Sequence, residues 1–127
     1  MSYNILIVDD SSIVRKQVKR TIGMAQIDIG SIWEAENGAD ALKILGDEWV
    51  DLVLLDINMP VMDGMEFMQR LSSDEDLKQT PVVILSTEGS AERLDALKSL
   101  GVRAQLRKPA QPIAIVNVIK DLLGGGK

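Results

Sequence analysis

The chain has 127 residues, of which 46% are hydrophobic and 26% charged, with a net charge of -5 at pH 7. These values fit one globular domain, and the acidic balance argues against direct nucleic-acid binding, which depends on clustered Lys and Arg. The absence of cysteine and histidine excludes disulfides, thiolate chemistry, histidine acid–base catalysis and phosphohistidine on this chain. Without a leader-like segment or an apolar run of about 18 residues, we expect a cytoplasmic protein with no membrane span.

Short apolar runs alternate along the chain with segments of helical period. We expect five strands, at 5–8, 29–35, 52–55, 82–85 (opened by Pro81) and 104–107. A helix should follow each strand. In chain order these helices run from Ser11 or Ser12 to Gly23, from 39 to Gly46, over 64–71, from Ser90 to about 100, and from Pro112 to about Leu123.

Five strand–helix units with strands this apolar predict a parallel sheet that helices cover on both faces. The economical arrangement is a doubly wound, flavodoxin-like α/β fold with strand order 2-1-3-4-5, whose ligands bind beyond the carboxyl ends of the strands. We expect one domain at 1–123. Residues 124–127 form a flexible Gly-rich tail, which is also a place where a longer protein could have been cut.

Polar side chains follow four of the predicted strands at the point where each strand ends. Asp9 and Asp10 follow the first strand, Asp56 the third, Ser86 the fourth and Lys108 the fifth. Carboxyl ends of parallel strands share one edge of the sheet, so these five side chains should converge. Such a set suits a divalent cation and a phosphoryl group.

Crowded carboxylates repel one another, and a hard cation with oxygen ligands relieves that repulsion. We expect Mg²⁺, with Asp10 and Asp56 as direct ligands, Asp9 acting through water, and the Asn58 carbonyl adding an oxygen. Taken alone, Asp9 and Asp10 could equally well serve only at the start of the following helix, where acidic side chains interact favourably with the helix dipole.

Asp56 could be an ordinary turn residue, but the four buried aliphatic residues before it favour a nucleophile that carries an acyl phosphate. Phosphoryl transfer needs mainly alignment and charge neutralisation, which Mg²⁺ and Lys108 would supply. Lys108 taken alone could be a solvated lysine, and Ser86 taken alone a strand-end hydroxyl. Together with Asp56, Ser86 becomes a candidate donor to a phosphoryl oxygen.

The chain resembles, over essentially its full length, the receiver domain of bacterial response regulators, the CheY-like family, and most of all its single-domain chemotaxis-type members. The matching motifs are Val8-Asp9-Asp10-Ser11, Leu55-Asp56-Ile57-Asn58-Met59-Pro60, Met62-Asp63-Gly64, Ser86-Thr87 and Lys108-Pro109. The resemblance implies that Asp56 receives a phosphoryl group from the phosphohistidine of a histidine kinase or phosphotransfer protein. It also implies that Lys108–Pro109 is cis, which X-Pro bonds permit.

The resemblance further implies that Ser86 and Lys108 sense the phosphoryl group and change the face formed by the helix from Ser90, the strand at 104–107 and the last helix. That face would bind a downstream protein. Gln105 stands where the family usually has Tyr or Phe, so switching should rely on Ser86, loop movement and a hydrogen-bond change at Gln105. Ala110-Gln111-Pro112 departs from the aromatic residue that commonly follows Lys-Pro.

Asn58 and Glu88 occupy the family's positions beside the water that hydrolyses the acyl phosphate, which suggests a short-lived phosphorylated state. A receiver of this kind promotes only its own phosphorylation and dephosphorylation, so we do not expect an enzyme. We expect a monomer or a weak phosphorylation-dependent dimer.

Methionine and tryptophan residues allow further expectations. Met65 and Met68 should be core residues, whereas Met59 and Met62 lie on the loop after Asp56 and could contact a kinase. The two tryptophans, Trp33 and Trp49, are expected to do no more than pack.

Three other functions compete with a stand-alone switch. The same domain could be the N-terminal receiver of a longer regulator with a DNA-binding or enzymatic output. A haloacid-dehalogenase-like phosphatase with Asp9 as nucleophile would need an Asp-x-Asp motif, and here Asp9 and Asp10 are adjacent. An unphosphorylated interaction module could have lost the acids or Lys108, and this chain keeps all of them.

Overall fold

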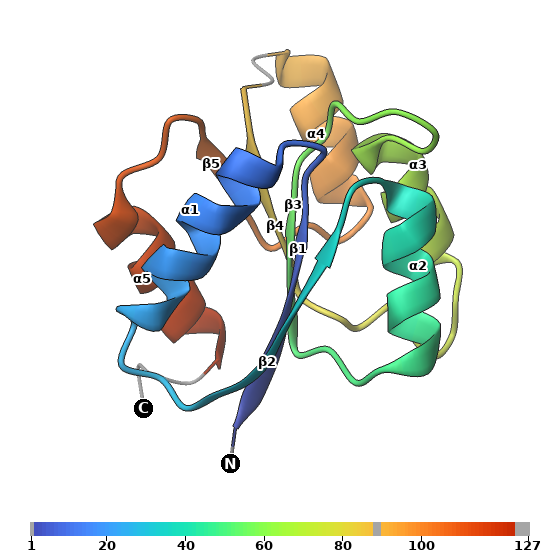
Figure 1. Cartoon of the computed structure of the whole chain (residues 1–127). Coiled ribbons are helices and arrows are strands. Elements are labelled where there is room, and N and C mark those ends of the chain that lie inside the picture. Colours follow the sequence, from blue (N-terminus) through green and yellow to red (C-terminus); the bar gives the residue numbers. More distant parts are fainter. Residues whose placement is uncertain (1, 88–89, 124–127) are drawn as a thin grey trace.

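The structure is a computed structural model that describes residues 2–87 and 90–123. Within these residues, five strands form one sheet in the order β2-β1-β3-β4-β5, and every neighbouring pair is parallel (Figure 1). The elements are β1 (Tyr3–Val8), α1 (Ser12–Gly23), β2 (Ile29–Ala35), α2 (Gly38–Asp47), β3 (Leu52–Leu55), α3 (Gly64–Ser72), β4 (Val82–Ser86), α4 (Ala91–Ser99), β5 (Ala104–Arg107) and α5 (Pro112–Leu123). The predicted doubly wound α/β fold and its strand order are confirmed.

Helices cover both faces of the sheet, and each face has its own hydrophobic core. Alternate residues of β1 divide between them: Leu6 and Val8 join the core under α2, α3 and α4, whereas Ile5 and Ile7 join the core under α1 and α5. Figure 1 shows α1 and α5 on one side of the sheet and α2 and α3 on the other. This two-sided burial explains why the strand sequences are almost entirely apolar.

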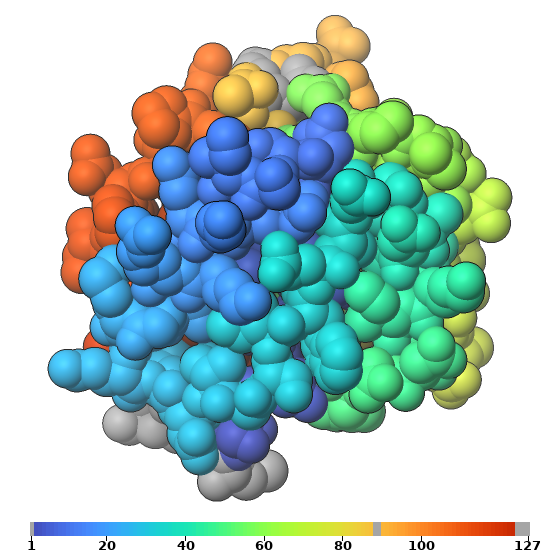
Figure 2. Space-filling view, viewed as in Figure 1, coloured from blue at the N-terminus to red at the C-terminus, as the bar shows by residue number. Residues whose placement is uncertain are grey.

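The edge of the sheet at β2 reaches the surface. In the space-filling view of Figure 2, the cyan segment that contains β2 lies between the blue of α1 and the green of α2. The inner strands β1, β3 and β4 are buried beneath these elements, with Leu52, Val53 and Val82 completely inaccessible. The inner strands are therefore packed on both faces up to the ends from which the predicted site residues emerge.

Side-chain caps begin α1, α2, α3 and α4. The Ser11 hydroxyl accepts a hydrogen bond from the Val14 amide, which settles the alternative between Ser11 and Ser12. Asn37, Asp63 and Ser90 cap α2, α3 and α4 in the same way. Because Ser90 is the cap, α4 begins at Ala91.

The strands predicted at 29–35, 52–55 and 104–107 are confirmed, whereas some other element boundaries differ from the predicted ones by one or two residues. β1 begins at Tyr3, whose amide is bonded to the Asp28 carbonyl, and β4 extends to include Ser86. Pro81 precedes β4 instead of opening it, and its carbonyl accepts a hydrogen bond from the Val53 amide. A proline has no amide proton to contribute to the ladder, so this position suits it.

Two expectations about large side chains are wrong. Met62 is only 8% exposed, because its side chain packs against Gly38, where an added Cβ would lie 2.8 Å from Met62 Cγ. It is therefore a core residue and offers no surface to a kinase. Trp49 is 75% exposed on the loop between α2 and β3, so packing does not account for it.

Other expectations are confirmed, or fall where the structure cannot test them. Met68 is buried and Met65 packs against the same core, as predicted. None of the helices described is long and apolar enough to cross a membrane. The predicted tail at 124–127 lies outside the described residues, and the domain boundary at 123 remains a prediction.

Candidate functional site

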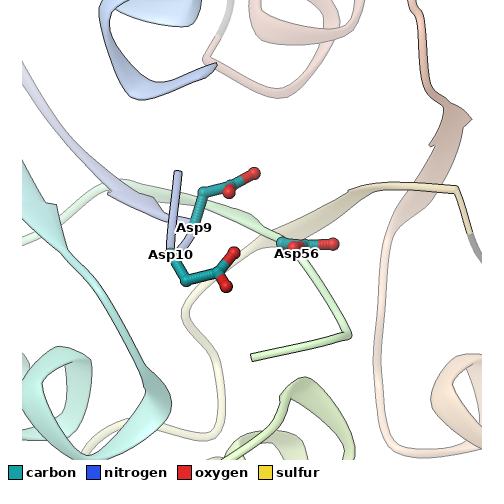
Figure 3. Close-up of side chains that lie close together, drawn as sticks. All are labelled: Asp9, Asp10 and Asp56. Carbon is teal, nitrogen blue, oxygen red and sulfur yellow. The ribbon is translucent and has the colours of Figure 1, made fainter. Parts of the chain in front are cut away.

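Three carboxylates gather beyond the carboxyl ends of β1 and β3. Val8 and Leu55 are paired in register, so the residues that follow them, Asp9 and Asp56, leave the sheet side by side. Carboxylate oxygens of Asp9, Asp10 and Asp56 all lie within 4.8 Å of one another, and Figure 3 shows the three side chains next to each other. Asp9 and Asp56 are buried, whereas Asp10 is exposed.

Lys108 joins these acids from the end of β5. Its Nζ lies 2.5 Å from Asp9 Oδ2 and 3.8 Å from Asp56 Oδ2. The Lys108 amide donates to the Ser86 carbonyl over 2.9 Å, which fixes the ends of β4 and β5 together. The Lys108–Pro109 peptide bond is cis in the structure, the isomer that the resemblance implied.

Asp9 is held in place by three partners. One carboxylate oxygen accepts the Ser11 amide at 2.9 Å and the other faces Lys108, while the Asp9 carbonyl accepts Arg15 Nη1 at 2.6 Å. Arg15 also forms an ion pair with Glu34 on β2.

The Glu34 carboxyl on β2 has a lowered pKa. Burial of Glu34 raises its pKa, but hydrogen bonds from Arg15 and Lys19 and their positive charges have the larger combined effect and lower it.

The Asp56 carboxyl has a raised pKa. Burial disfavours its charged form, and the Asp9 carboxylate adds to that effect. The Lys108 ammonium and hydrogen bonds from the Ser86 hydroxyl and the Ile57 amide act in the opposite direction without cancelling it. A further cation would therefore stabilise the ionised site.

The loop after Asp56 turns back tightly on the strand end. The Gly64 amide donates to the Ile57 carbonyl at 2.7 Å. A Cβ at Gly64 would lie 2.8 Å from both the Asp56 carbonyl oxygen and the Ile57 Cα. Only glycine fits at this first position of α3, where the helix approaches the backbone that follows β3.

Ser86, at 2% exposure, ends β4 within hydrogen-bond reach of Asp56. Asn58 is exposed in the loop two residues after Asp56. Metal ligation by its carbonyl stays a prediction. Glu88 lies outside the described residues, so its expected role next to the hydrolytic water has no structural counterpart here.

Gln105 contacts α4 through a hydrogen bond. Its Nε2 donates to the Leu94 carbonyl at 3.0 Å. A cavity of about 140 Å³ lies between β4, β5 and α4, lined in part by Gln105, Ser86 and Leu94. Gln105 and Ser86 thus border one cavity, next to Leu94 of α4.

The sequence indicated which groups converge, but it did not indicate two residues that contact the predicted site residues Asp9 and Gln105. Arg15 lies one turn into α1, where its guanidinium returns to the Asp9 carbonyl. Its spacing of six residues from Asp9 was the available signal. Leu94 supplies the backbone oxygen that Gln105 binds, and no sequence pattern marks a backbone acceptor.

The sequence matches the response regulator receiver domain over residues 5–120. The chain therefore belongs to the response regulator receiver family. It is a CheY-like receiver of two-component signalling, a class that implies a histidine kinase partner and downstream targets.

Individual relatives agree with this assignment. The chain is 34% identical over 124 residues to the "Chemotaxis protein CheY homolog" of Campylobacter jejuni, covering 96% of this chain and 93% of that protein. It is 35% identical to part of the "Autoinducer 1 sensor kinase/phosphatase LuxN" of Vibrio harveyi, covering 97% of this chain but 13% of that protein. The structure of Vibrio cholerae chemotaxis response regulator CheY4 superposes with a TM-score of 0.85 at 30% identity, covering 96% of this chain and 99% of that one.

Proposed function

We propose that Asp56 accepts a phosphoryl group from the phosphohistidine of a histidine kinase or phosphotransfer protein, in a reaction that depends on Mg²⁺. The observation that carries this proposal is the position of Asp56. Its buried carboxyl lies beside Asp9 and Asp10, with one oxygen 3.8 Å from the Lys108 ammonium.

The donor set fits Mg²⁺. Carboxylate oxygens are the ligands that this ion prefers, and a partly exposed acidic edge allows it to keep several waters. Asp10 and Asp56 would bind it directly, Asp9 through water, and the Asn58 carbonyl would add an oxygen. When bound, Mg²⁺ supplies positive charge that offsets the carboxylates and the phosphoryl oxygens.

The transfer itself requires little of the protein beyond alignment. An Asp56 carboxylate oxygen forms a bond to phosphorus while the phosphorus–nitrogen bond to the donor imidazole breaks, and the imidazole nitrogen keeps the electron pair. Lys108 neutralises one phosphoryl oxygen and the Ser86 hydroxyl donates to another. Because Lys108 already lies within 3.8 Å of Asp56, a small shift away from Asp9 suffices.

The phosphorylated state would be read through α4, β5 and α5. Movement of Ser86 toward the phosphoryl group changes the wall of the 140 Å³ cavity that it shares with Gln105 and Leu94. The Gln105–Leu94 hydrogen bond is then the contact that holds or releases α4. A changed α4-β5-α5 face would bind the downstream protein target.

Several further features belong to this proposal. The chain catalyses only its own phosphorylation and dephosphorylation, with Asn58 and Glu88 beside the hydrolytic water. It acts in the cytoplasm as a monomer or weak phosphorylation-dependent dimer, with no contact to nucleic acid. Similarity to a CheY homolog supports a role in chemotaxis.

A second candidate is a receiver unit within a longer regulator. The match to LuxN supports it, because there a segment like this chain makes up 13% of a sensor kinase/phosphatase. The phosphorylation chemistry is the same in both cases. Only the route of output differs.

The test uses a small phosphodonor such as acetyl phosphate, with Mg²⁺ or with a chelator, and measures intact mass. The wild-type chain should gain one phosphoryl group only with Mg²⁺, and Asp56→Asn should gain none. Asp47→Asn, which removes an exposed acid at the end of α2, should behave as wild type. Equal labelling of Asp56→Asn, or labelling that persists in the chelator, contradicts the proposal.

A further inference from the structure

A second surface lies at the opposite edge of the sheet from Asp56, where β3 and β4 begin. The loops that enter these two strands border a cavity of about 310 Å³, with Trp49 as one wall (Figure 1 shows both loops at the lower edge). β3 has four residues, so this cavity and Asp56 are separated by roughly 13 Å of strand. The cavity therefore shares no lining residue with the acidic group at the other end of β3.

The cavity combines apolar and acidic groups. The apolar residues of its lining are Leu45, Val50, Leu77 and Pro81. The acidic residues Glu48, Asp51 and Asp76 line it as well. Among the residues that the structure describes, no lysine or arginine lines it. An apolar lining with only negative charge around it complements a long aliphatic side chain that ends in a cation.

The indole of Trp49 is fixed despite its 75% exposure. The indole Nε1 donates to Asp51 Oδ1 at 2.9 Å, and the backbone carbonyl of Trp49 accepts a hydrogen bond from Asn4 Nδ2 at 3.0 Å. Asp51 Oδ2 in turn accepts a hydrogen bond from the backbone N–H of Asn4 at 2.8 Å. A ring anchored at its nitrogen presents its faces to solvent, and an aromatic face attracts cations.

Two of the acidic side chains at the cavity have no charged partner among the described residues. Across the part of the chain that the structure describes, Glu48 and Asp76 form no ion pair. The lysine of the same loop, Lys78, is paired with Glu75 at 2.8 Å. The negative charge at the cavity is therefore not compensated from within the described residues.

We propose that this surface binds an arginine-bearing peptide segment of a partner protein, with the guanidinium stacked on Trp49 and facing Glu48 and Asp76. The methylene stem of the arginine lies against Leu45 and Val50. Arginine suits the site better than lysine because its planar guanidinium stacks on an aromatic face while donating hydrogen bonds to carboxylates. A partner held here leaves Asp56 accessible for phosphorylation.

The experiment titrates the ¹⁵N-labelled full chain with the tripeptide acetyl-Gly-Arg-Gly-amide and follows its amide and indole resonances. We expect saturable shifts of the Trp49 indole N–H and of the amides at 45–51 and 76–80. The matched peptide with citrulline, which has the same shape without the charge, should bind about five-fold more weakly.

Three variants locate the binding. Trp49→Ala should abolish the shifts while the remaining spectrum stays folded, and Glu48→Gln/Asp76→Asn should weaken binding about five-fold. The control Asp95→Asn/Asp121→Asn removes the same charge from exposed positions on α4 and α5 and should bind as wild type.

Each contrary result overturns the proposal. Absence of shifts at the cavity with the arginine peptide would show that no site exists. Equal binding of the citrulline peptide would show that the positive charge of arginine is not recognised. Equal weakening by the control variant would reduce the effect to the net charge of the chain.

Discussion

Asp56 is 7% exposed and lies between a like charge from Asp9 and an opposite charge from Lys108. Burial dominates this balance and raises the Asp56 pKa above its ordinary value of 3.8. Protonation therefore favours the folded state. The contribution of Asp56 to stability is complete below pH 3.8 and is lost as the pH rises through the raised pKa.

Asp56→Asn should consequently be more stable than the wild-type chain at neutral pH in a chelating buffer, because a buried charge has been removed. The difference in the free energy of unfolding should shrink as the pH falls toward the ordinary pKa of Asp. Urea unfolding across this pH range measures it. A variant that is less stable than wild type at neutral pH would contradict the pKa direction.

Lys108 and a bound cation compete for the same carboxylates. Replacing Lys108 by Met keeps the stem and removes the charge that lies 2.5 Å from Asp9, so the Mg²⁺ dissociation constant should fall roughly three- to ten-fold. Asp10→Asn removes a proposed metal ligand, so it should raise the Mg²⁺ dissociation constant. Titration calorimetry gives both values, and an unchanged affinity in Lys108→Met would mean that Lys108 does not act on the metal site.

At the scale of secondary-structure elements, the junction between β3 and α3 depends on Gly64. Its missing Cβ leaves room for the backbone of Asp56 and Ile57, which follows directly on β3. Gly64→Ala should lower the free energy of unfolding by about 1–3 kcal/mol and slow phosphorylation of Asp56. Urea unfolding and phosphorylation kinetics measure the two effects.

Gly46→Ala is the matched control, because no atom of the described residues lies within 4 Å of a Cβ added there and the residue is in α2. It should be neutral or stabilise the protein by up to about 1 kcal/mol. If both substitutions had the same effect, close packing at Gly64 would not be the cause.

The contact between β5 and α4 should control how easily α4 opens. Gln105→Ala removes the donor to the Leu94 carbonyl, so amide hydrogen exchange over 94–100 should become about two- to five-fold faster. Gln69→Ala, at an exposed position on α3, is the control. Unchanged exchange in Gln105→Ala would mean that this hydrogen bond does not hold α4.

At the scale of the whole molecule, the arrangement of the sheet could be predicted because its sequence signal is strong. The apolar runs at 5–8 and 52–55 end on Asp9 and Asp56, and parallel pairing must bring such ends together. Loop side chains carry no comparable signal. The burial of Met62 and the exposure of Trp49 depend on loop conformation, which hydrophobic period does not encode.

The direct pairing of Lys108 with Asp9 could not be predicted for a related reason. Sequence order placed both residues at one edge but gave no means to choose between Asp9, 2.5 Å from the Lys108 ammonium, and Asp56, 3.8 Å from it. That choice depends on where the strand ends twist relative to one another. The sequence predicts that Asp9, Asp56 and Lys108 lie close together, whereas only the three-dimensional structure shows which acid Lys108 pairs with.

The most direct measurement of the central claim is the identity of the phosphorylated residue. An acyl phosphate on aspartate is reduced by borohydride to homoserine, which peptide mass spectrometry locates. After treatment with acetyl phosphate and Mg²⁺, homoserine should appear at position 56 and nowhere else. Homoserine at another acid, or a reduction-resistant phosphate on Ser86, would contradict the account.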